Sequence, residues 1–460
     1  MFLLALALQA PAAPSATDAV RAAMDAFRER AAAGAHAYEA AQEASMPLLR
    51  EGKLDEAIAL MLRAVPEKER TPEQAFLLGN MLFDLAPEVS ARLHEEAWRA
   101  LPAMPPVAYE WALQHHRAGR HREAEDLYAG LVAGEVFAAP PVHALRADCL
   151  LHLGRHADAV QSWKQANGAQ HHTEIEEAVC WIYGPSSPYA RRCAMLARAA
   201  KGEAKALEEA VLLDLAFDRD WWNVERQEEF LAHDLALAKK AFGETSARWK
   251  ELDLLVRAKT EMRGADPLQD MLRKMRKDGG KAFDLAGEAA KVGVWGENAR
   301  LPVSSIVASN LFELFTSNQI ANEAELGRRF EKELRARGEA GDVEALEVLA
   351  AIYSATADPK LVELDRLGWE RHKDVRFGGS LLAARADEVK LDDPLLLGLR
   401  ALPRMDAGVE RIAYGAAARE KRPLVEPIAR IAMAEFQRMV SYVEVNAAMR
   451  ELERELAKKK

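Results

Sequence analysis

One pattern restricts the fold of this chain more than any other: a small residue that recurs about every 34 residues. Ala57, Ala91, Ala124 and Ala159 are separated by steps of 34, 33 and 35 residues, and a larger side chain follows each one helical turn later. A small residue lets two helices approach closely, and the larger one fills the space beside the crossing. Self-similarity at this period predicts stacked antiparallel helix pairs, because one pair cannot bury its apolar face alone.

The turns and first helices of these pairs repeat as well. A tight turn needs the backbone freedom of glycine, and three of the expected turns contain Gly52, Gly119 and Gly154. In the second pair, Leu78 and Gly79 stand on the first helix. The equivalent place in the other pairs is taken by Ser45, Ala112 and Ala147.

On these residues, the segment 37–170 resembles tetratricopeptide repeats, in which a Leu-Gly pair marks the first helix. The match departs from the family pattern at Glu95, His115 and His143, where a large apolar residue is usual. The resemblance implies an all-α, right-handed superhelical solenoid of antiparallel helix pairs. It also implies a concave surface, lined by the first helices, that binds a protein or peptide.

Composition agrees with an all-α chain of several packed parts. Half of the residues are apolar, 29% are charged, and Gly and Pro fall between the periodic segments. The pattern divides the chain into a signal peptide (1–16), a lead-in capping helix ended by Gly34 (17–36), the array (37–170), degenerate helix pairs (171–245) and a C-terminal helical-repeat region (246–460). Helices are expected in the last two at 173–183, 188–201, 203–217, 220–242, 303–317, 322–338, 342–355, 360–372, 375–389, 393–402, 405–421 and 424–457. Gly and Pro are densest over 279–303, which we expect to be a boundary.

Charge and hydropathy indicate the cellular location of the chain and exclude some classes of partner. A net charge of −10 disfavours nucleic acid as a partner, since phosphate binding needs a basic face. The apolar start, followed by small residues and proline, resembles a short secretory signal, although it lacks Lys and Arg. No apolar run is long enough to span a bilayer. We expect export to the periplasm or cell envelope of a bacterium, with a cytoplasmic protein as the alternative.

Three cysteines are present, and two of them are placed to form a bond. Cys180 and Cys193 flank a Gly-Pro break at nearly equal distances, so they would lie at the same height on antiparallel helices. A disulfide between them is expected if the chain is exported. Cys149 is expected to be a small buried residue of the fourth pair.

Histidine is unevenly distributed, yet no metal or catalytic motif emerges. Nine of the twelve histidines lie between His94 and His172. No carboxylate or cysteine stands at a recognised ligand spacing from them, so no metal site and no cofactor are expected. The alternatives are a pH-sensitive groove and ordinary packing. The sequence motifs of zinc proteases, phosphate-binding loops and nucleophile elbows are absent, so we expect no enzyme activity, the C-terminal region being the least certain part.

The resemblance assigns the partner-binding positions to the outward side of the first helices. The expected partner-binding residues are Asn80, Phe83, Asp84, Tyr109, Leu113, His116, Arg117, Asp148 and His152. Together they would form an aromatic floor with a few hydrogen-bonding groups, which suits an extended or helical peptide. The alternative is that these are ordinary surface residues without a binding role.

Two functions from different classes follow. The first is a non-catalytic, exported scaffold that binds a protein or peptide in the concave face. The second is a module that binds carbohydrate or an envelope polymer, or the helical arm of a polymer-modifying enzyme. The sequence feature that supports this second function is an aromatic stretch that begins at Trp221 and Trp222. Core packing between helix pairs explains the same aromatic residues without any ligand.

Overall fold

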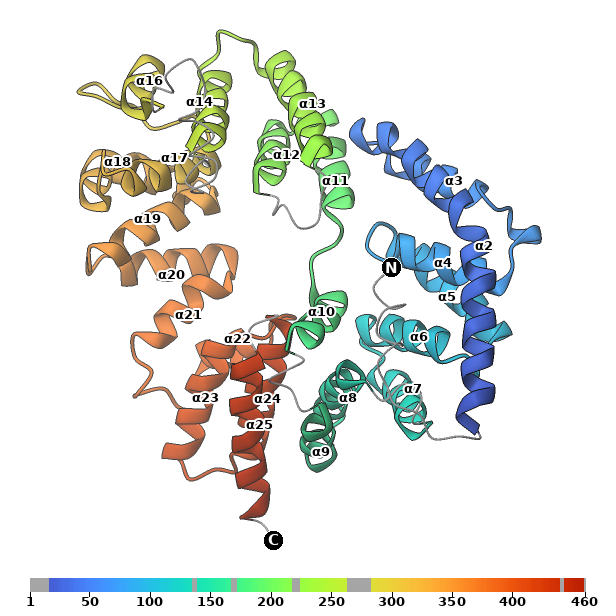
Figure 1. Cartoon of the computed structure of the whole chain (residues 1–460). Helices are drawn as coiled ribbons and strands as arrows, with labels where there is room; N and C mark the ends of the chain where they lie inside the picture. The colour runs from blue at the N-terminus through green and yellow to red at the C-terminus, as the bar shows by residue number, and fades with distance from the viewer. Residues whose placement is uncertain are drawn as a thin grey trace, which may run out of the picture. The chain divides into compact units, whose positions relative to one another are not determined.

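A computed structural model describes residues 16–134, 139–166, 172–216, 224–262, 283–438 and 442–458. These residues form 23 α-helices and one short 3-10 helix, without strands. Helices that are adjacent in sequence pack as pairs (Figure 1). The predicted all-α class and its helix pairs are confirmed. In the described part of the chain, no helix combines the length and apolarity needed to cross a membrane.

The chain forms two compact units. Unit 1 comprises residues Met1–Arg191 and Leu382–Lys460, and unit 2 comprises Arg192–Leu381. The described helices of unit 1 are α2 (Ala16–Arg50), α3 (Leu54–Arg63), the 3-10 helix η1 (Glu67–Glu69), α4 (Pro72–Leu82), α5 (Pro87–Ala100), α6 (Pro105–Arg117), α7 (His121–Ala133), α8 (Pro140–His152), α9 (His156–Ala166), α10 (His172–Tyr183), α22 (Pro394–Arg400), α23 (Ala407–Arg419), α24 (Val425–Gln437) and α25 (Tyr442–Ala457).

The described helices of unit 2, together with the two that cross its limits, are α11 (Pro188–Ala200), α12 (Ala204–Ala216), α13 (Val224–Phe242), α14 (Ala247–Met262), α16 (Leu285–Val292), α17 (Ser305–Ser317), α18 (Glu323–Glu339), α19 (Val343–Ala355), α20 (Leu361–His372) and α21 (Val375–Ala383). Unit 2 has its own apolar core, in which Phe312 stacks on Phe330. Arg192 of α11 is buried there and donates from Nε to Asp234 Oδ2 of α13 at 2.8 Å.

Three of the four expected helix pairs have the predicted turn and crossing. Gly52, Gly119 and Gly154 adopt left-handed backbone conformations, with φ of 78°, 71° and 71°, which other residues rarely adopt. The small residues expected at these crossings, Ala57, Ala124 and Ala159, have no exposed surface. These pairs therefore close as the sequence predicts.

The second pair differs from the prediction by one residue. Ala91 is only half-buried, whereas Ser90 is fully buried and donates from Oγ to the carbonyl oxygen of Gly79 at 2.7 Å. One turn later, His94 is buried in place of the expected Glu95. The turn between α4 and α5 contains no glycine and enters α5 at Pro87, so it aligns the helices differently. Ser90 is therefore the small residue at this crossing.

The expected break at Gly34 is wrong. Helix α2 runs without interruption from Ala16 to Arg50, so the lead-in helix and the first helix of the first pair are one element. A single glycine in a helix costs only about 1 kcal/mol relative to alanine. Packing of α2 against α3 and α4 offsets that cost.

The C-terminal segment also departs from the expected organisation. The single helix expected over 424–457 is two helices, α24 and α25. They belong to unit 1 and not to one region with the rest of 246–460. The expected boundary at 279–303 contains a helix, α16, and residues 263–282 before it lie outside the described part of the chain.

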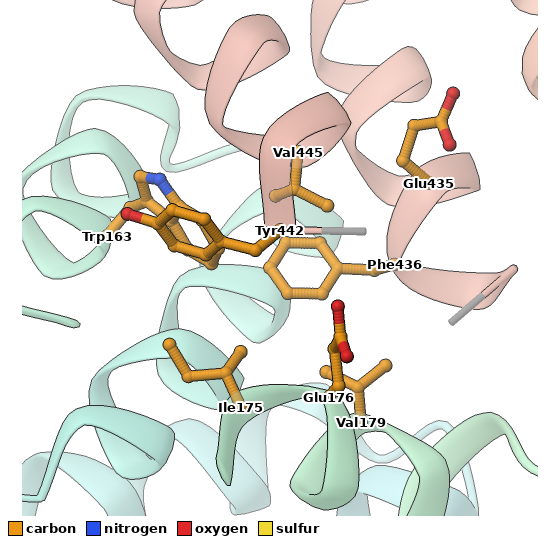
Figure 2. Close-up of a pocket in the computed structure, with 8 residues that line it drawn as sticks. All are labelled: Trp163, Ile175, Glu176, Val179, Glu435, Phe436, Tyr442 and Val445. Atoms are coloured by element: carbon orange, nitrogen blue, oxygen red, sulfur yellow. The ribbon is translucent and has the colours of Figure 1, made fainter. Parts of the chain in front are cut away.

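Aromatic packing explains how α24 and α25 join unit 1. Figure 2 shows Trp163 of α9 beside Tyr442 of α25 and Phe436 of α24, above Ile175 and Val179 of α10. Trp163 stacks on Tyr442 at 5.3 Å between ring centroids and meets Phe436 edge-on at 5.5 Å. The cavity between these side chains is about 20 Å³. That volume suits a single water molecule, so this junction is a core and not a ligand site.

Candidate functional site

The structure does not expose the predicted concave surface. Of the nine expected partner-binding residues, five are buried: Phe83, Tyr109, Leu113, His116 and Asp148. The remaining four are half-buried: Asn80, Asp84, Arg117 and His152. The expectation that these side chains point outward is therefore corrected for the buried five. Their role in binding a partner stays a prediction.

Helix α10 and the residues after it cover several of these side chains. The ring of Trp181 meets Phe83 edge-on at 5.1 Å between centroids, and the hydroxyl of Tyr183 donates to Asp148 Oδ2. The backbone N–H of Ser187 donates to the carbonyl oxygen of Asp84 at 3.3 Å. The chain's own helix thus lies on the face that the resemblance reserves for a partner.

Helix α10 packs there because it is amphipathic. Its buried side chains, Ile175, Ala178, Val179 and Ile182, recur at helical spacing and join the core of unit 1. Trp181 lies off this stripe and keeps 38% of its surface exposed. It is the residue that the sequence interpretation missed. A large aromatic residue outside the apolar stripe of its own helix is the signal that could have identified it.

Asn80 belongs to a buried network instead of an open surface. His94 Nε2 lies 2.7 Å from Asn80 Oδ1, and Gln114 Nε2 lies 3.0 Å from His94 Nδ1. Because the nitrogen of the Gln114 amide can only donate, His94 accepts at Nδ1 and donates at Nε2, which is a neutral imidazole. Burial lowers the pKa of His94 to about 3, consistent with this neutral form.

A second buried network surrounds Asp148. Its Oδ2 atom lies 2.9 Å from His116 Nε2, and its Oδ1 atom lies 3.5 Å from His152 Nδ1. Burial alone would raise the pKa of Asp148, but His152 and His116 hold it well below its ordinary value. Burial alone would lower the pKa of His152, but the charge and the hydrogen bonds of Asp148 together raise it. The carboxylate is therefore ionised inside unit 1 and held by basic side chains.

His121 completes this group of histidines. Its ring stacks on that of His152 at 3.9 Å between centroids, at the start of α7. Burial, with smaller contributions from the neighbouring histidines, lowers the pKa of His121 to about 4. One donor atom each of His116, His121 and Cys149 lies within 4.8 Å of the others. The sequence predicts no metal site, yet folding brings these three potential ligands together.

Two half-buried residues of the predicted surface, Asp84 and Arg117, lie around Phe83 together with Trp181. We call Trp181, Asp84 and Arg117 the Trp181 edge. Arg117 donates from Nη1 to the carbonyl oxygen of Phe83 at 3.1 Å, lies 3.4 Å from Asp84 Oδ1, and places its guanidinium over the Phe83 ring at 4.9 Å. Burial raises the pKa of Asp84, although Arg117 acts in the opposite direction. Trp181 and Arg117 thus flank one ring, and both are partly open to solvent.

Unit 1 also has a wider and shallower depression, of about 640 Å³, near α22. Its lining mixes charges of both signs with two leucines: Lys390, Leu391, Asp392, Leu397, Glu420 and Arg422. Leu397 is 51% exposed there. None of these residues was expected to bind a partner.

The predicted disulfide is not formed. All three cysteines are thiols in the structure. Cys180 lies in α10 of unit 1, whereas Cys193 belongs to unit 2. The two cysteines would lie at the same height only if they belonged to one helical hairpin, but they belong to different units. The aromatic pair Trp221 and Trp222 lies outside the described residues.

No family model and no curated protein matches the chain.

Proposed function

We propose that this chain is a non-catalytic helical-repeat scaffold that binds another protein, and that the Trp181 edge is the contact. The observation that carries the proposal is the 38% exposure of Trp181 beside Arg117 in a region otherwise covered by α10. Tryptophan and arginine are the residues most enriched among those that contribute strongly to binding at protein interfaces. The leucine-lined depression near α22 contains an arginine, Arg422, but no tryptophan.

Pre-organisation supports the same surface. The Phe83 carbonyl and ring fix the Arg117 guanidinium, and the Phe83 ring also supports Trp181. Side chains that are already ordered lose less conformational entropy when a partner binds. An apolar side chain of the partner would pack on Trp181, and a carboxylate would pair with Arg117.

The proposal includes the repeat type. We propose that α2 to α9 form an array of the tetratricopeptide-repeat kind, wound as a right-handed superhelix. The buried small residues and left-handed turn glycines support it. In this arrangement α10 occupies the place of a bound peptide, so the partner contacts the edge of the covered face and not its centre.

The test is affinity capture followed by direct measurement. Proteins captured by the purified chain from an envelope fraction are identified, and the affinity of each purified candidate is measured by calorimetry. Trp181→Ala and Arg117→Ala are each expected to weaken binding at least tenfold, which corresponds to about 1.4 kcal/mol. Circular dichroism shows whether each variant keeps its helical content.

The matched control is Leu397→Ala, which removes an exposed apolar side chain from another surface of unit 1. It is expected to leave the affinity unchanged. If Leu397→Ala abolishes binding while Trp181→Ala does not, the interface lies near α22 and the Trp181 edge is ruled out.

A further inference from the structure

Three helices of unit 1 bring metal-binding side chains to one place. His116 is in the last turn of α6, His121 is the first residue of α7, and Cys149 lies inside α8. One donor atom from each lies within 4.8 Å of the other two. Zinc–ligand bonds of about 2.0–2.3 Å place the donors of one ion about 3.3–4 Å apart, so small side-chain movements would bring all three into contact with one ion.

Hydrogen bonding prepares His116 for this role. Its Nε2 atom is taken by Asp148 Oδ2 at 2.9 Å, which leaves Nδ1 for another partner. The Tyr128 hydroxyl lies 3.5 Å from Nδ1, at the outer limit of a hydrogen bond. A carboxylate that holds the far nitrogen of a histidine fixes the ring's orientation and raises its basicity as a ligand.

His121 supplies the second, independent observation. Its Nδ1 atom is buried and has no hydrogen-bond partner among the described residues. A buried polar nitrogen without a partner is unfavourable and calls for an explanation. The ring is half-buried, so the group is reachable from solvent on this side.

The charges of the group also suit a divalent ion. Cys149 would bind as a thiolate, and Asp148 beside it is a buried carboxylate. The thiolate and this carboxylate, which His152 also contacts, would place negative charge near a 2+ ion, where an uncompensated charge is costly. Two imidazoles and one thiolate are ligands that zinc prefers over magnesium or calcium.

We propose that His116, His121 and Cys149 bind one zinc-type divalent cation, with Asp148 as the positioning residue for His116. This goes beyond partner binding, because it requires neither a partner nor the Trp181 edge. The ion would join the third helix pair, α6 and α7, to the first helix of the fourth pair, α8, since each of these helices supplies one ligand. With three protein ligands, a fourth position stays open to water or to a donor from a partner.

Cobalt(II) tests the site directly, because a cobalt–thiolate bond gives an absorption band in the near ultraviolet. The full chain is freed of metal with a chelator and titrated with Co²⁺. One equivalent is expected to produce the band, and Zn²⁺ is expected to remove it by competition. Cys149→Ser is expected to abolish the band, and His121→Gln is expected to weaken Co²⁺ binding at least tenfold.

The controls separate this site from adventitious binding. Cys180→Ser removes another thiol of unit 1 and is expected to leave the band unchanged. Thermal unfolding gives a second readout: Zn²⁺ is expected to raise the melting temperature of the wild type but not of Cys149→Ser. A band that persists in Cys149→Ser, or no band in the correctly folded wild type at stoichiometric Co²⁺, would overturn the proposal.

Discussion

At the scale of single residues, the second helix pair shows how a glycine and a histidine depend on each other. The sequence contains the Leu78-Gly79 pair, but the reason for the glycine is visible only in the structure. A Cβ atom on Gly79 would lie 2.6 Å from His94 Nε2, so the missing side chain makes room for the buried ring. Asn80, expected on an open surface, fixes that ring instead.

The exchange of Gly79 for alanine tests this packing. Gly79→Ala is expected to destabilise unit 1 by about 1–3 kcal/mol, because the new methyl group would displace His94. Urea unfolding followed by circular dichroism measures the change. Gly130→Ala is the control, since Gly130 lies in α7 with open space around its Cβ position. That change is expected to stabilise by up to about 1 kcal/mol. Equal effects of the two substitutions would contradict the packing argument.

His94 also predicts a dependence of stability on pH. Its pKa is about 3 in the folded chain and about 6.5 when exposed, so the unfolded state binds the extra proton. Its stabilising contribution is therefore complete well above pH 6.5 and is lost as the pH falls from there toward 3. The loss between pH 7 and pH 5 is about 1–2 kcal/mol.

The measurement compares urea unfolding of the wild type and of His94→Gln at pH 7 and pH 5. The polar neighbours Asn80, Gln114 and Ser90 are uncharged, so the effect is assigned to His94 alone. The wild type is expected to lose more stability than His94→Gln between these values. An identical loss in both would exclude His94 as the cause.

At the scale of helices, register decides which residue lies at a crossing. The period of about 34 residues places the small residue of the second pair at Ala91, and the structure places it at Ser90. The difference arises in the turn between α4 and α5, which lacks the left-handed glycine of the other pairs. The sequence predicts which helices pair, but a turn of different shape shifts their faces by one residue.

Adjacent substitutions test the register. Ser90→Leu is expected to destabilise unit 1 by about 3 kcal/mol or more, because it would overfill the crossing and remove the hydrogen bond to Gly79. Ala91→Leu is expected to change stability by less than about 1 kcal/mol, because that position is half-buried. Thermal unfolding of the two variants under the same conditions measures the difference in their stability. The reverse order of stability would show that the predicted register was right after all.

At the scale of the whole chain, contacts between distant segments decide what a unit contains. Residues 382–460 follow unit 2 in the sequence but join the core of unit 1 through α24 and α25. Leu452, with no exposed surface, lies in that core. The folded state of the N-terminal repeats therefore depends on residues almost 300 positions away, as the contact of Trp163 with Asn446 also shows.

Hydrogen exchange on a single substitution tests this dependence. Leu452→Ala is expected to cost about 2–5 kcal/mol and to reduce amide protection in α8, α9 and α10, while protection in α17 to α19 is retained. The mirror control is Leu349→Ala in the core of unit 2, where α17 to α19 are expected to lose protection instead. Loss of protection in α17 to α19 with Leu452→Ala would show that the two units unfold together.

The sequence by itself determined the local features of this protein. Periodicity and backbone preference act within a few residues. They predict the helical class, most helix limits, the three turns that contain glycine and the three crossings that contain alanine. Of the candidate site, it identified Asp84 and Arg117 but not Trp181, because the coverage of Phe83 by α10 is a long-range contact. The same reason applies to the group of His116, His121 and Cys149, whose members come from three helices and follow no ligand spacing. Only the tertiary structure decided which faces are covered and which donors meet, since burial of apolar surface between distant segments carries no local signature.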